Sequence, residues 1–418
     1  MRTDLPLALL GSDEGQRADA ILRSCVHCGF CNATCPTYLI EGDELDGPRG
    51  RIYLIKEMLE TGIADTVTRT HLDRCLTCRS CETTCPSGVK YGELLELGRD
   101  TLENAPVRGL RDRLVRWGLR RIVPYPRRFG PLVALGRAVR GLLPRRLRAA
   151  VPPRFPTQPV TSPAPAPGPR VAGRVLLLEG CVQRVATPGV NDALRALLAA
   201  RGVEVVTVRD EGCCGGLALH LGARADAEAT MSRLLDALAP HLDDIDAILS
   251  TASGCGVTIK DYGRLLAHDS ARAPLARRVA ALTRDVAEYL GDLSGDWARD
   301  PTLKRVAWHP PCTLQHGQRV TGVVERLLRQ AGYELVPVVD AHLCCGSAGT
   351  YSLLEPARAE RLGSAKRSAL LAGAPDVIAT ANIGCQLHLS VAEPAAEPAA
   401  GPGNHQRVAV RHWIELLR

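Results

Sequence analysis

The sequence has 418 residues, which is enough for two or three domains with cores of their own. Aromatic residues make up only 4%, so no surface for stacking nucleic-acid bases is indicated, and no apolar run approaches the ~18 residues of a membrane-spanning helix. The formal net charge is +7. The N-terminal stretch does not resemble a signal peptide, so we expect the sixteen cysteines to be metal ligands rather than part of a secreted disulfide scaffold. We expect a cytoplasmic protein, or one peripheral to the cytoplasmic face of the inner membrane.

The first feature along the chain is a cysteine motif that occurs twice between residues 25 and 86. Each copy reads C-x2-C-x2-C-x3-C-P, first at Cys25, Cys28, Cys31 and Cys35, then at Cys75, Cys78, Cys81 and Cys85. This is the spacing of ferredoxins with two [4Fe–4S] clusters, in which three cysteines of one run hold one cluster and the fourth reaches the other. We therefore predict one cluster on Cys25, Cys28, Cys31 and Cys85, and a second on Cys75, Cys78, Cys81 and Cys35.

Zinc and disulfides are the alternatives for these eight cysteines. Zinc takes two CxxC pairs or adds histidine rather than needing a third cysteine in register, and disulfides need an oxidising compartment. Between the two runs, Ile52, Ile55, Met58 and Leu59 recur at helical spacing after a turn that begins at Asp46. Because helices are expected to separate the cysteine loops, residues 1–104 are predicted to form a helical two-cluster ferredoxin domain.

Residues 105–150 are predicted to form a basic amphipathic helical segment, and residues 151–172 a linker. Between positions 108 and 148 there are thirteen arginines and one acid, Asp112. Such a segment either docks a partner or a membrane surface, which we favour, or is a solvated face that offsets the nearby negative clusters. Eight prolines between 152 and 169 hold the linker extended, and the biased stretch 393–403 predicts a surface loop.

The remaining eight cysteines lie in an internal repeat. The first copy, residues 173–300, contains Cys181, Cys213, Cys214 and Cys255, and the second, residues 301–418, contains Cys312, Cys344, Cys345 and Cys385. In both copies the adjacent pair is followed by glycine, and the lone cysteine precedes the pair by the same distance. We call these two copies the CCG domains.

Short apolar runs alternate with Ala/Leu-rich helical stretches in both CCG domains. Strands are predicted at 174–179, 203–208 and 246–251, and again at 305–309, 333–339 and 376–380. This alternation predicts α/β domains with parallel sheets, so the whole chain is expected to be a multidomain α+β protein. Because the cysteines follow strand ends, and ligands bind at that edge of such sheets, the four cysteines of each copy are expected to converge.

Three kinds of site remain open for these four thiols: a further iron–sulfur cluster, a zinc ion, or a thiol/disulfide redox site. We favour a metal site. His309, His316 and His342 lie near the second set of cysteines, but lone histidines near strand ends are more often hydrogen-bonded, so we do not predict them as ligands. The GCCGG stretch at 212–216 lacks the spacing of a nucleotide-binding loop.

Three stretches, CVHCGFCNATCPTYLIEGDELDGPRGRIYLIKEMLE, HLDRCLTCRSCETTCPSGVKYGELL and CCGSAGTYSLLEP, closely resemble the iron–sulfur subunits of bacterial glycolate oxidase. The resemblance covers essentially the whole chain, and residues 47–56 are more specific to it than the ferredoxin motif. The linker and the insertion at 393–403 depart from the family without touching a motif. Related families with the same layout are the small subunit of anaerobic glycerol-3-phosphate dehydrogenase, lactate-utilisation iron–sulfur proteins and heterodisulfide reductase subunits.

The resemblance implies a subunit of a multisubunit enzyme that oxidises glycolate, and D-lactate too, to the 2-oxo acid. Partner subunits would hold FAD and the substrate, since this chain has no flavin signature. This subunit would relay electrons toward a membrane acceptor such as quinone and would not be catalytic alone. A different class remains open, a thiol reductase in which the CCG cysteines do the chemistry themselves; a redox sensor is disfavoured because no DNA-binding motif is present.

Overall fold

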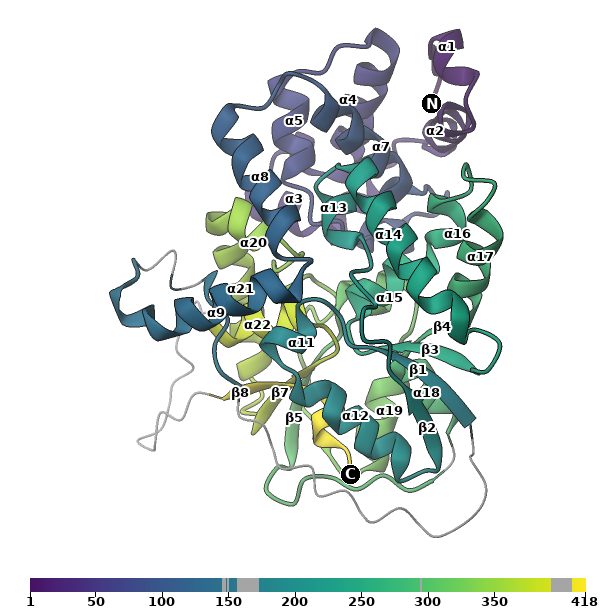
Figure 1. The fold of residues 1–418 in the computed structure, drawn as a ribbon. Helices are drawn as coiled ribbons and strands as arrows, with labels where there is room; N and C mark the ends of the chain where they lie inside the picture. The colour runs from purple at the N-terminus through teal and green to yellow at the C-terminus, as the bar shows by residue number, and fades with distance from the viewer. Residues whose placement is uncertain (145–147, 149, 156–172, 294, 392–407) are drawn as a thin grey trace.

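The computed structural model describes residues 1–144, 148, 150–155, 173–293, 295–391 and 408–418. A helical N-terminal part is followed by two four-stranded parallel sheets with helices around them, which confirms the predicted fold class (Figure 1). The predicted linker lies outside the described residues from position 156 onward, and so does the insertion at 393–403. Within the described ranges no helix is long and apolar enough to cross a bilayer.

Helices separate the two cysteine loops of the N-terminal domain, as predicted. Leu22, Ile55, Leu72 and Leu94 meet in its core, each at most 1% exposed, because apolar residues at helical spacing face inward from four helices. The elements are α1 (Leu7–Leu10), α2 (Asp13–Ser24), η1 (Phe30–Thr34), α3 (Pro36–Glu41), η2 (Glu44–Asp46), α4 (Pro48–Thr61), α5 (Thr66–Asp73), α6 (Ser80–Thr84) and α7 (Tyr91–Asn104).

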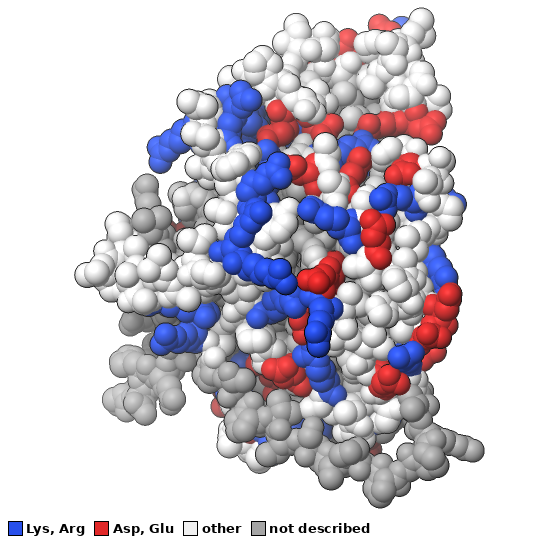
Figure 2. All heavy atoms as spheres, viewed as in Figure 1, with Lys and Arg blue, Asp and Glu red and all other residues white. Residues whose placement is uncertain are grey.

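The basic segment forms α8 (Leu110–Ile122), α9 (Pro126–Ala138) and the short η3 (Arg140–Leu142). Part of its charge is neutralised within the chain: Arg108, only 1% exposed, pairs with Asp73 at 2.7 Å and with Glu103 at 2.9 Å. Arg120 pairs with Glu103 and also with Asp226 of the first CCG domain, at 3.1 Å. These contacts fix α8 against both domains, while other basic side chains gather on its outer face (Figure 2).

Both CCG domains have the same sheet topology. The strand order is β2-β1-β3-β4 in the first and β6-β5-β7-β8 in the second, with every pair parallel. The first contains β1 (Gly173–Leu178), α11 (Gln183–Ala186), α12 (Gly189–Ala199), β2 (Val203–Val206), α13 (Gly216–His220), α14 (Arg224–Leu238), η4 (Ala239–His241), β3 (Ala247–Ser250), α15 (Ser253–Lys260), α16 (Tyr262–Leu265), α17 (Ala273–Leu282), β4 (Thr283–Asp285) and α18 (Val286–Asp292). The second contains β5 (Arg305–His309), η5 (Thr313–Gly317), α19 (Val323–Gln330), β6 (Glu334–Leu335), α20 (Tyr351–Leu354), α21 (Pro356–Leu371), β7 (Val377–Thr380), α22 (Ile383–Val391), β8 (Ala409–His412) and η6 (Trp413–Leu416).

One hydrophobic core is shared by the two CCG domains. Val175 and Leu177 of β1 point into the same cluster as Val306 and Trp308 of β5, and Trp413 after β8 is fully buried there. The opposite face of each sheet packs on its own helices, in separate clusters. Because residues alternate between the faces of a strand, the continuous apolar runs in the sequence supply both cores.

Candidate metal centres

Five cysteines from both cysteine runs line one cavity of the N-terminal domain. Cys25, Cys28 and Cys31 come from the first run, Cys81 and Cys85 come from the second, and Arg49 lies at the cavity wall. Burial first, and then the thiols of Cys25 and Cys85, raise the pKa of Cys31 to about 11. The four cysteines predicted for the first cluster thus lie around one cavity together with Cys81, so the cavity alone does not decide which four hold the cluster, and the crossed assignment stays a prediction.

The other four cysteines of the motif gather deeper in the molecule. Burial, and then Cys78, Cys75 and Cys35, raise the pKa of the Cys81 thiol, so this group also combines three cysteines of one run with the last of the other. The Tyr91 hydroxyl donates to the Cys75 Sγ over 3.6 Å. Whereas Cys28 is exposed, all four members of this second group are buried.

The backbone winds the same way around both groups. His27 and Gly29 in the first loop have φ values of 56° and 83°, and Thr77 and Arg79, fifty positions later, have 54° and 58°. Left-handed residues alternating with right-handed ones turn successive N–H groups inward, a concavity that suits anionic groups such as iron–sulfur clusters. Three of these four residues are not glycine. The left-handed backbone of each of the three costs about 1–3 kcal/mol of folding free energy, which the surrounding fold has to offset. In the second group the Thr77 N–H donates to the Cys75 Sγ over 3.4 Å. The thiol donors and this repeated backbone turn together fit a cluster at each position.

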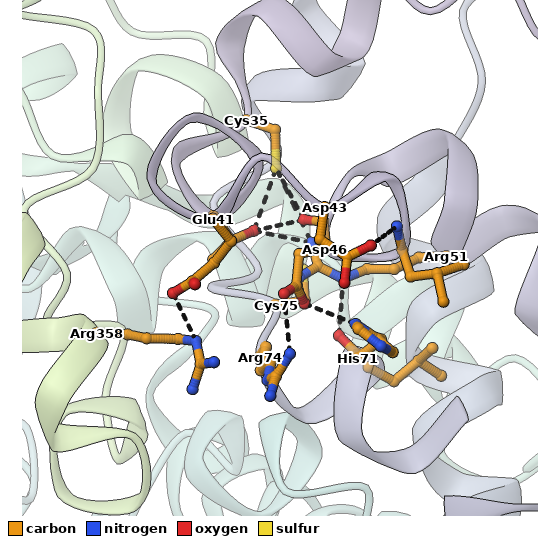
Figure 3. A network of polar contacts seen from close by, with 12 residues as sticks. Cys35, Glu41, Asp43, Asp46, Arg51, His71, Arg74, Cys75 and Arg358 are labelled. Carbon is orange, nitrogen blue, oxygen red and sulfur yellow. Dashed lines mark hydrogen bonds and ion pairs between the residues drawn. The ribbon is translucent and has the colours of Figure 1, made fainter. Parts of the chain in front are cut away.

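A buried arginine lies beside the second cysteine group. Arg51 is fully buried, and its Nη1 lies 3.9 Å from the Cys35 Sγ and 3.0 Å from the Thr37 hydroxyl, while its Nε donates to the His71 carbonyl over 2.7 Å. The Asp46 carboxylate accepts hydrogen bonds from Arg51 and, over 3.0 Å, from Arg74. It also pairs with His71 over 2.9 Å (Figure 3). The cation thus has a carboxylate partner but lies next to sulfur. Sequence reasoning treated residues 46–50 only as a turn and missed this network, because a lone arginine carries no spacing signal.

In the first CCG domain the four predicted cysteines converge at the carboxyl end of the sheet. The Cys181 Sγ lies 3.5 Å from the Cys213 Sγ. The Cys214 thiol is hydrogen-bonded to Cys213 on one side and to Cys255, at the start of α15, on the other. Together with the Cys181–Cys213 contact, these bonds raise the pKa of Cys213 and Cys255 and lower that of Cys214. Gly215 allows this arrangement: at φ 80°, a Cβ there would lie 2.9 Å from Met231 and 3.0 Å from the Ala227 carbonyl of α14. The glycine of the CCG motif therefore seats the cysteine pair against the helix.

The second CCG domain repeats this geometry beside the ferredoxin domain. Cys312 and Cys344 have their Sγ atoms 3.8 Å apart, and Gly346 at φ 88° would place a Cβ 2.8 Å from Leu362. Cys78 of the second ferredoxin group packs in the same small hydrophobic cluster as Cys312 and Cys344. Burial, then Cys312, raise the pKa of the Cys78 thiol. The ferredoxin domain thus approaches the second CCG site directly.

The three histidines near this site differ in their contacts. His316 lies 2.8 Å from the Thr83 hydroxyl and 3.2 Å from the His342 carbonyl, which agrees with the prediction of a hydrogen-bonded histidine. His309 contradicts that prediction. Both of its ring nitrogens are buried without a hydrogen-bond partner among the described residues, and its side chain lies against Cys345 and Cys385. A pattern read along the sequence missed this because only the sheet brings position 309 to position 385.

Comparison with known proteins agrees with this arrangement of sites. Residues 21–89 match the family described as "4Fe-4S dicluster domain", and residues 175–260 and 306–390 match the family described as "Cysteine-rich domain". Together with the two thiol groups and the paired parallel sheets, these matches define the class: a 4Fe–4S dicluster protein with two cysteine-rich domains.

The particular family follows from relatives that align along the whole chain. The chain is 45% identical to the glycolate oxidase iron–sulfur subunit of Escherichia coli (strain K12), with 100% of this chain and 98% of the relative covered. It is 31% identical to the probable glycolate oxidase iron–sulfur subunit of Bacillus subtilis (strain 168), over 91% of this chain and 89% of the relative. One subunit of the fumarate reductase (CoM/CoB) of Methanothermobacter marburgensis is 28% identical over 88% of this chain and 67% of its own length. The chain belongs to the family of glycolate oxidase iron–sulfur subunits, as its motifs predicted.

Proposed function

We propose that this chain is the electron-transfer subunit of a multisubunit glycolate oxidase and is not catalytic alone. Partner subunits hold FAD and oxidise glycolate, and also D-lactate, to the 2-oxo acid, and a membrane acceptor such as quinone receives the electrons. The observation that carries the proposal is the direct packing of Cys78 against Cys312 and Cys344, which joins the ferredoxin domain to a second sulfur-rich site. The full-length likeness to glycolate oxidase iron–sulfur subunits supports the choice of substrate.

Within this proposal, Cys25, Cys28, Cys31 and Cys85 hold one [4Fe–4S] cluster, and Cys75, Cys78, Cys81 and Cys35 hold the other. When bound, each cluster accepts and releases one electron at a time. The chain contributes thiolate ligands, the Thr77 N–H that donates to the Cys75 Sγ, and burial that keeps water from the second group. Arg49, which pairs with Glu44 at 2.7 Å, lies at the first cavity, and Arg51 lies beside Cys35 of the second group. Both cations would offset part of the negative charge of the clusters.

The substrate is tested on the complex purified anaerobically with its partner subunits. We expect glycolate, and D-lactate, to generate the EPR signals of reduced clusters in the complex but not in the isolated chain, since FAD is in the partners. Zinc in place of iron, or clusters that stay oxidised with both acids, would contradict the proposal.

The crossed ligand assignment is tested with two double variants. Cys28→Ala with Cys35→Ala removes one predicted ligand from each cluster, so both clusters should be lost. Cys28→Ala with Cys85→Ala removes two ligands of the same cluster, so iron equivalent to one cluster should remain. The opposite pattern of iron content would show that each cysteine run holds its own cluster.

A thiol-active reductase is the second candidate, favoured by the close thiol chains of the CCG domains and by the likeness to part of a fumarate reductase (CoM/CoB). Cys214→Ser and Cys345→Ser distinguish the two functions. If the CCG thiols do the chemistry, either variant abolishes turnover and the ferredoxin clusters are still reduced. If the chain only relays electrons from the flavin, glycolate still reduces these clusters, and no disulfide substrate is consumed by the unmodified complex.

We also propose that α8 contacts a partner subunit. Leu110, Leu114 and Trp117 recur on one side of this helix and are 73%, 58% and 54% exposed, among exposed arginines (Figure 2). Trp117→Glu should therefore release the chain from its complex in size-exclusion chromatography. Leu7→Glu, a change at an 87% exposed leucine elsewhere, is the control. An intact complex that no longer binds anionic vesicles would assign the helix to a membrane surface instead.

A further inference from the structure

His309 is a buried imidazole for which the described protein provides no hydrogen bond. It ends β5, is 1% exposed, and neither Nδ1 nor Nε2 has a partner in the part of the chain that the structure describes. One of its nitrogens and the sulfurs of Cys345 and Cys385 all lie within 4.8 Å of one another. These three atoms come from β5, from the loop before α20, and from α22, so the fold itself brings them together.

Leaving such a group unpaired is unfavourable. A buried polar group without a hydrogen bond costs about 1–3 kcal/mol, and a sequence under no other constraint replaces it with an apolar residue. Three other histidines of the second CCG domain, His316, His388 and His412, each have a ring nitrogen within 2.8–3.2 Å of a backbone or hydroxyl oxygen. In the first domain His220 has only its Nδ1 buried without a partner among the described residues, whereas His309 has neither nitrogen paired. A neutral imidazole whose nitrogen faces two thiols is instead suited to be a metal ligand.

The first CCG domain shows that the position does not require a polar residue. The lone cysteine and the cysteine pair are each displaced by 131 positions between the copies, Cys181 to Cys312 and Cys213 to Cys344. The same displacement pairs His309 with Leu178, which ends β1 and is 5% exposed. It pairs Lys366, whose Nζ donates to the Asp340 carbonyl over 2.6 Å, with Leu235. The second copy therefore has a nitrogen donor and a buried cation where the first has two leucines.

We propose that His309 is a ligand of the metal centre in the second CCG domain, so that the two CCG sites are chemically different. This rests on the proposal above that the CCG cysteines hold metal. In the first domain His220 lies near Cys214 and its Nδ1 also has no hydrogen-bond partner, but among the described residues no imidazole there forms such a close group with two cysteines. The first site therefore offers the thiolates of Cys181, Cys213, Cys214 and Cys255. The second offers thiolates and one imidazole, a mixed sulfur–nitrogen set that accepts a zinc ion or an iron–sulfur centre. Lys366 offsets part of the thiolate charge near the second site only.

The test uses the full chain, purified anaerobically with its partners and labelled with [15N]histidine. His309→Leu copies the leucine of the first domain, and His316→Leu is the control at a histidine that already has hydrogen-bond partners. If the metal is iron, pulsed EPR of the reduced protein should show a histidine nitrogen coupling that His309→Leu loses and His316→Leu keeps. If it is zinc, X-ray absorption should show the imidazole scattering disappear in the same variant. Metal should also be lost to a chelator at least about tenfold faster from His309→Leu.

A third variant guards against simple misfolding. His309→Cys replaces the nitrogen with another soft ligand, so it should retain the metal and lose only the nitrogen signal. Unchanged chelator sensitivity and an unchanged nitrogen signal in His309→Leu would overturn the proposal. Because the two ferredoxin clusters and their reduction by glycolate are measured in the same samples, failure of the proposed function would be seen separately, as missing cluster signals in the unmodified protein.

Discussion

Removing the positive charge of Arg51 should lower the reduction potential of the second ferredoxin cluster. The Arg51 Nη1 lies 3.9 Å from the Cys35 Sγ in a fully buried setting. Reduction adds a negative charge to the cluster, and a nearby cation stabilises that state. We expect Arg51→Met to shift this potential to more negative values and to leave the first cluster, which Arg51 does not contact, unchanged.

The size of the shift follows from the distance. With an effective dielectric constant of about 20, a unit charge roughly 7 Å from the cluster centre contributes about 2.4 kcal/mol. For a one-electron couple, about 1.4 kcal/mol corresponds to 59 mV, so the full effect is about 100 mV. Asp46, 3.4 Å from Arg51, offsets part of it, so the expected shift is roughly 50–100 mV.

The assay is a redox titration of the complex followed by EPR. Arg51→Lys keeps the charge and should change the potential far less than Arg51→Met, which separates charge from shape. Should Arg51→Met fail to retain iron, Arg74→Gln removes a less buried cation from the same carboxylate and should lower the same potential by a smaller amount. Equal shifts in the lysine and methionine variants, or a shift of the first cluster alone, would refute the reasoning.

Three further predictions concern stability. Burial raises the pKa of Asp285 to about 6, so the stability that its protonated form provides is complete below about pH 4 and is lost as the pH rises through 6. The thermal midpoint of Asp285→Asn should therefore gain on that of the unmodified protein between about pH 4 and pH 6, and an equal gap across that range would contradict the prediction. Gly215→Ala should destabilise the first CCG domain by about 1–3 kcal/mol more than Gly212→Ala. Both glycines have φ near 80°, but only a Cβ at Gly215 would contact α14. Equal thermal midpoints of the two variants would show that packing is not the cause. Gly222→Ala should weaken the contact between the first CCG domain and the ferredoxin domain, because a Cβ there would lie 2.4 Å from a backbone oxygen of α7. In the control Gly88→Ala the new Cβ meets nothing within 4 Å. Limited proteolysis would reveal the weakened contact, and identical digestion of the two variants would argue against it.

The strands of the sheet interiors were predictable because they are buried on both faces. The runs that became β1, β3, β5 and β7 are continuous in apolar residues, which is typical of central parallel strands. The fourth strands β4 and β8 were missed, since Thr283–Asp285 and Ala409–His412 are short and contain charged residues. The strand predicted at 333–339 is reduced to β6, because Pro337 has no N–H to continue the ladder.

The candidate sites were predictable to the extent that they obey spacing. Repeated cysteine intervals predicted that the two cysteine runs would come together, and in the structure thiols of both runs lie around one cavity. The division of the eight cysteines between two clusters stays a prediction. Arg51 and His309 were not recognised, because their significance depends on a buried position beside sulfur rather than on neighbours in sequence. A charge beside sulfur, as at Arg51, and a nitrogen without a hydrogen-bond partner, as at His309, can be recognised only in the folded structure.

The core common to both sheets has a consequence for how the duplicated half of the chain behaves. Separating the halves would expose Val175 and Leu177 from one side and Val306 and Trp308 from the other to water. Each half alone would thus expose a large apolar surface, so we expect the two CCG domains to fold as a single cooperative unit. Both sets of CCG cysteines therefore depend on the same core for their positions.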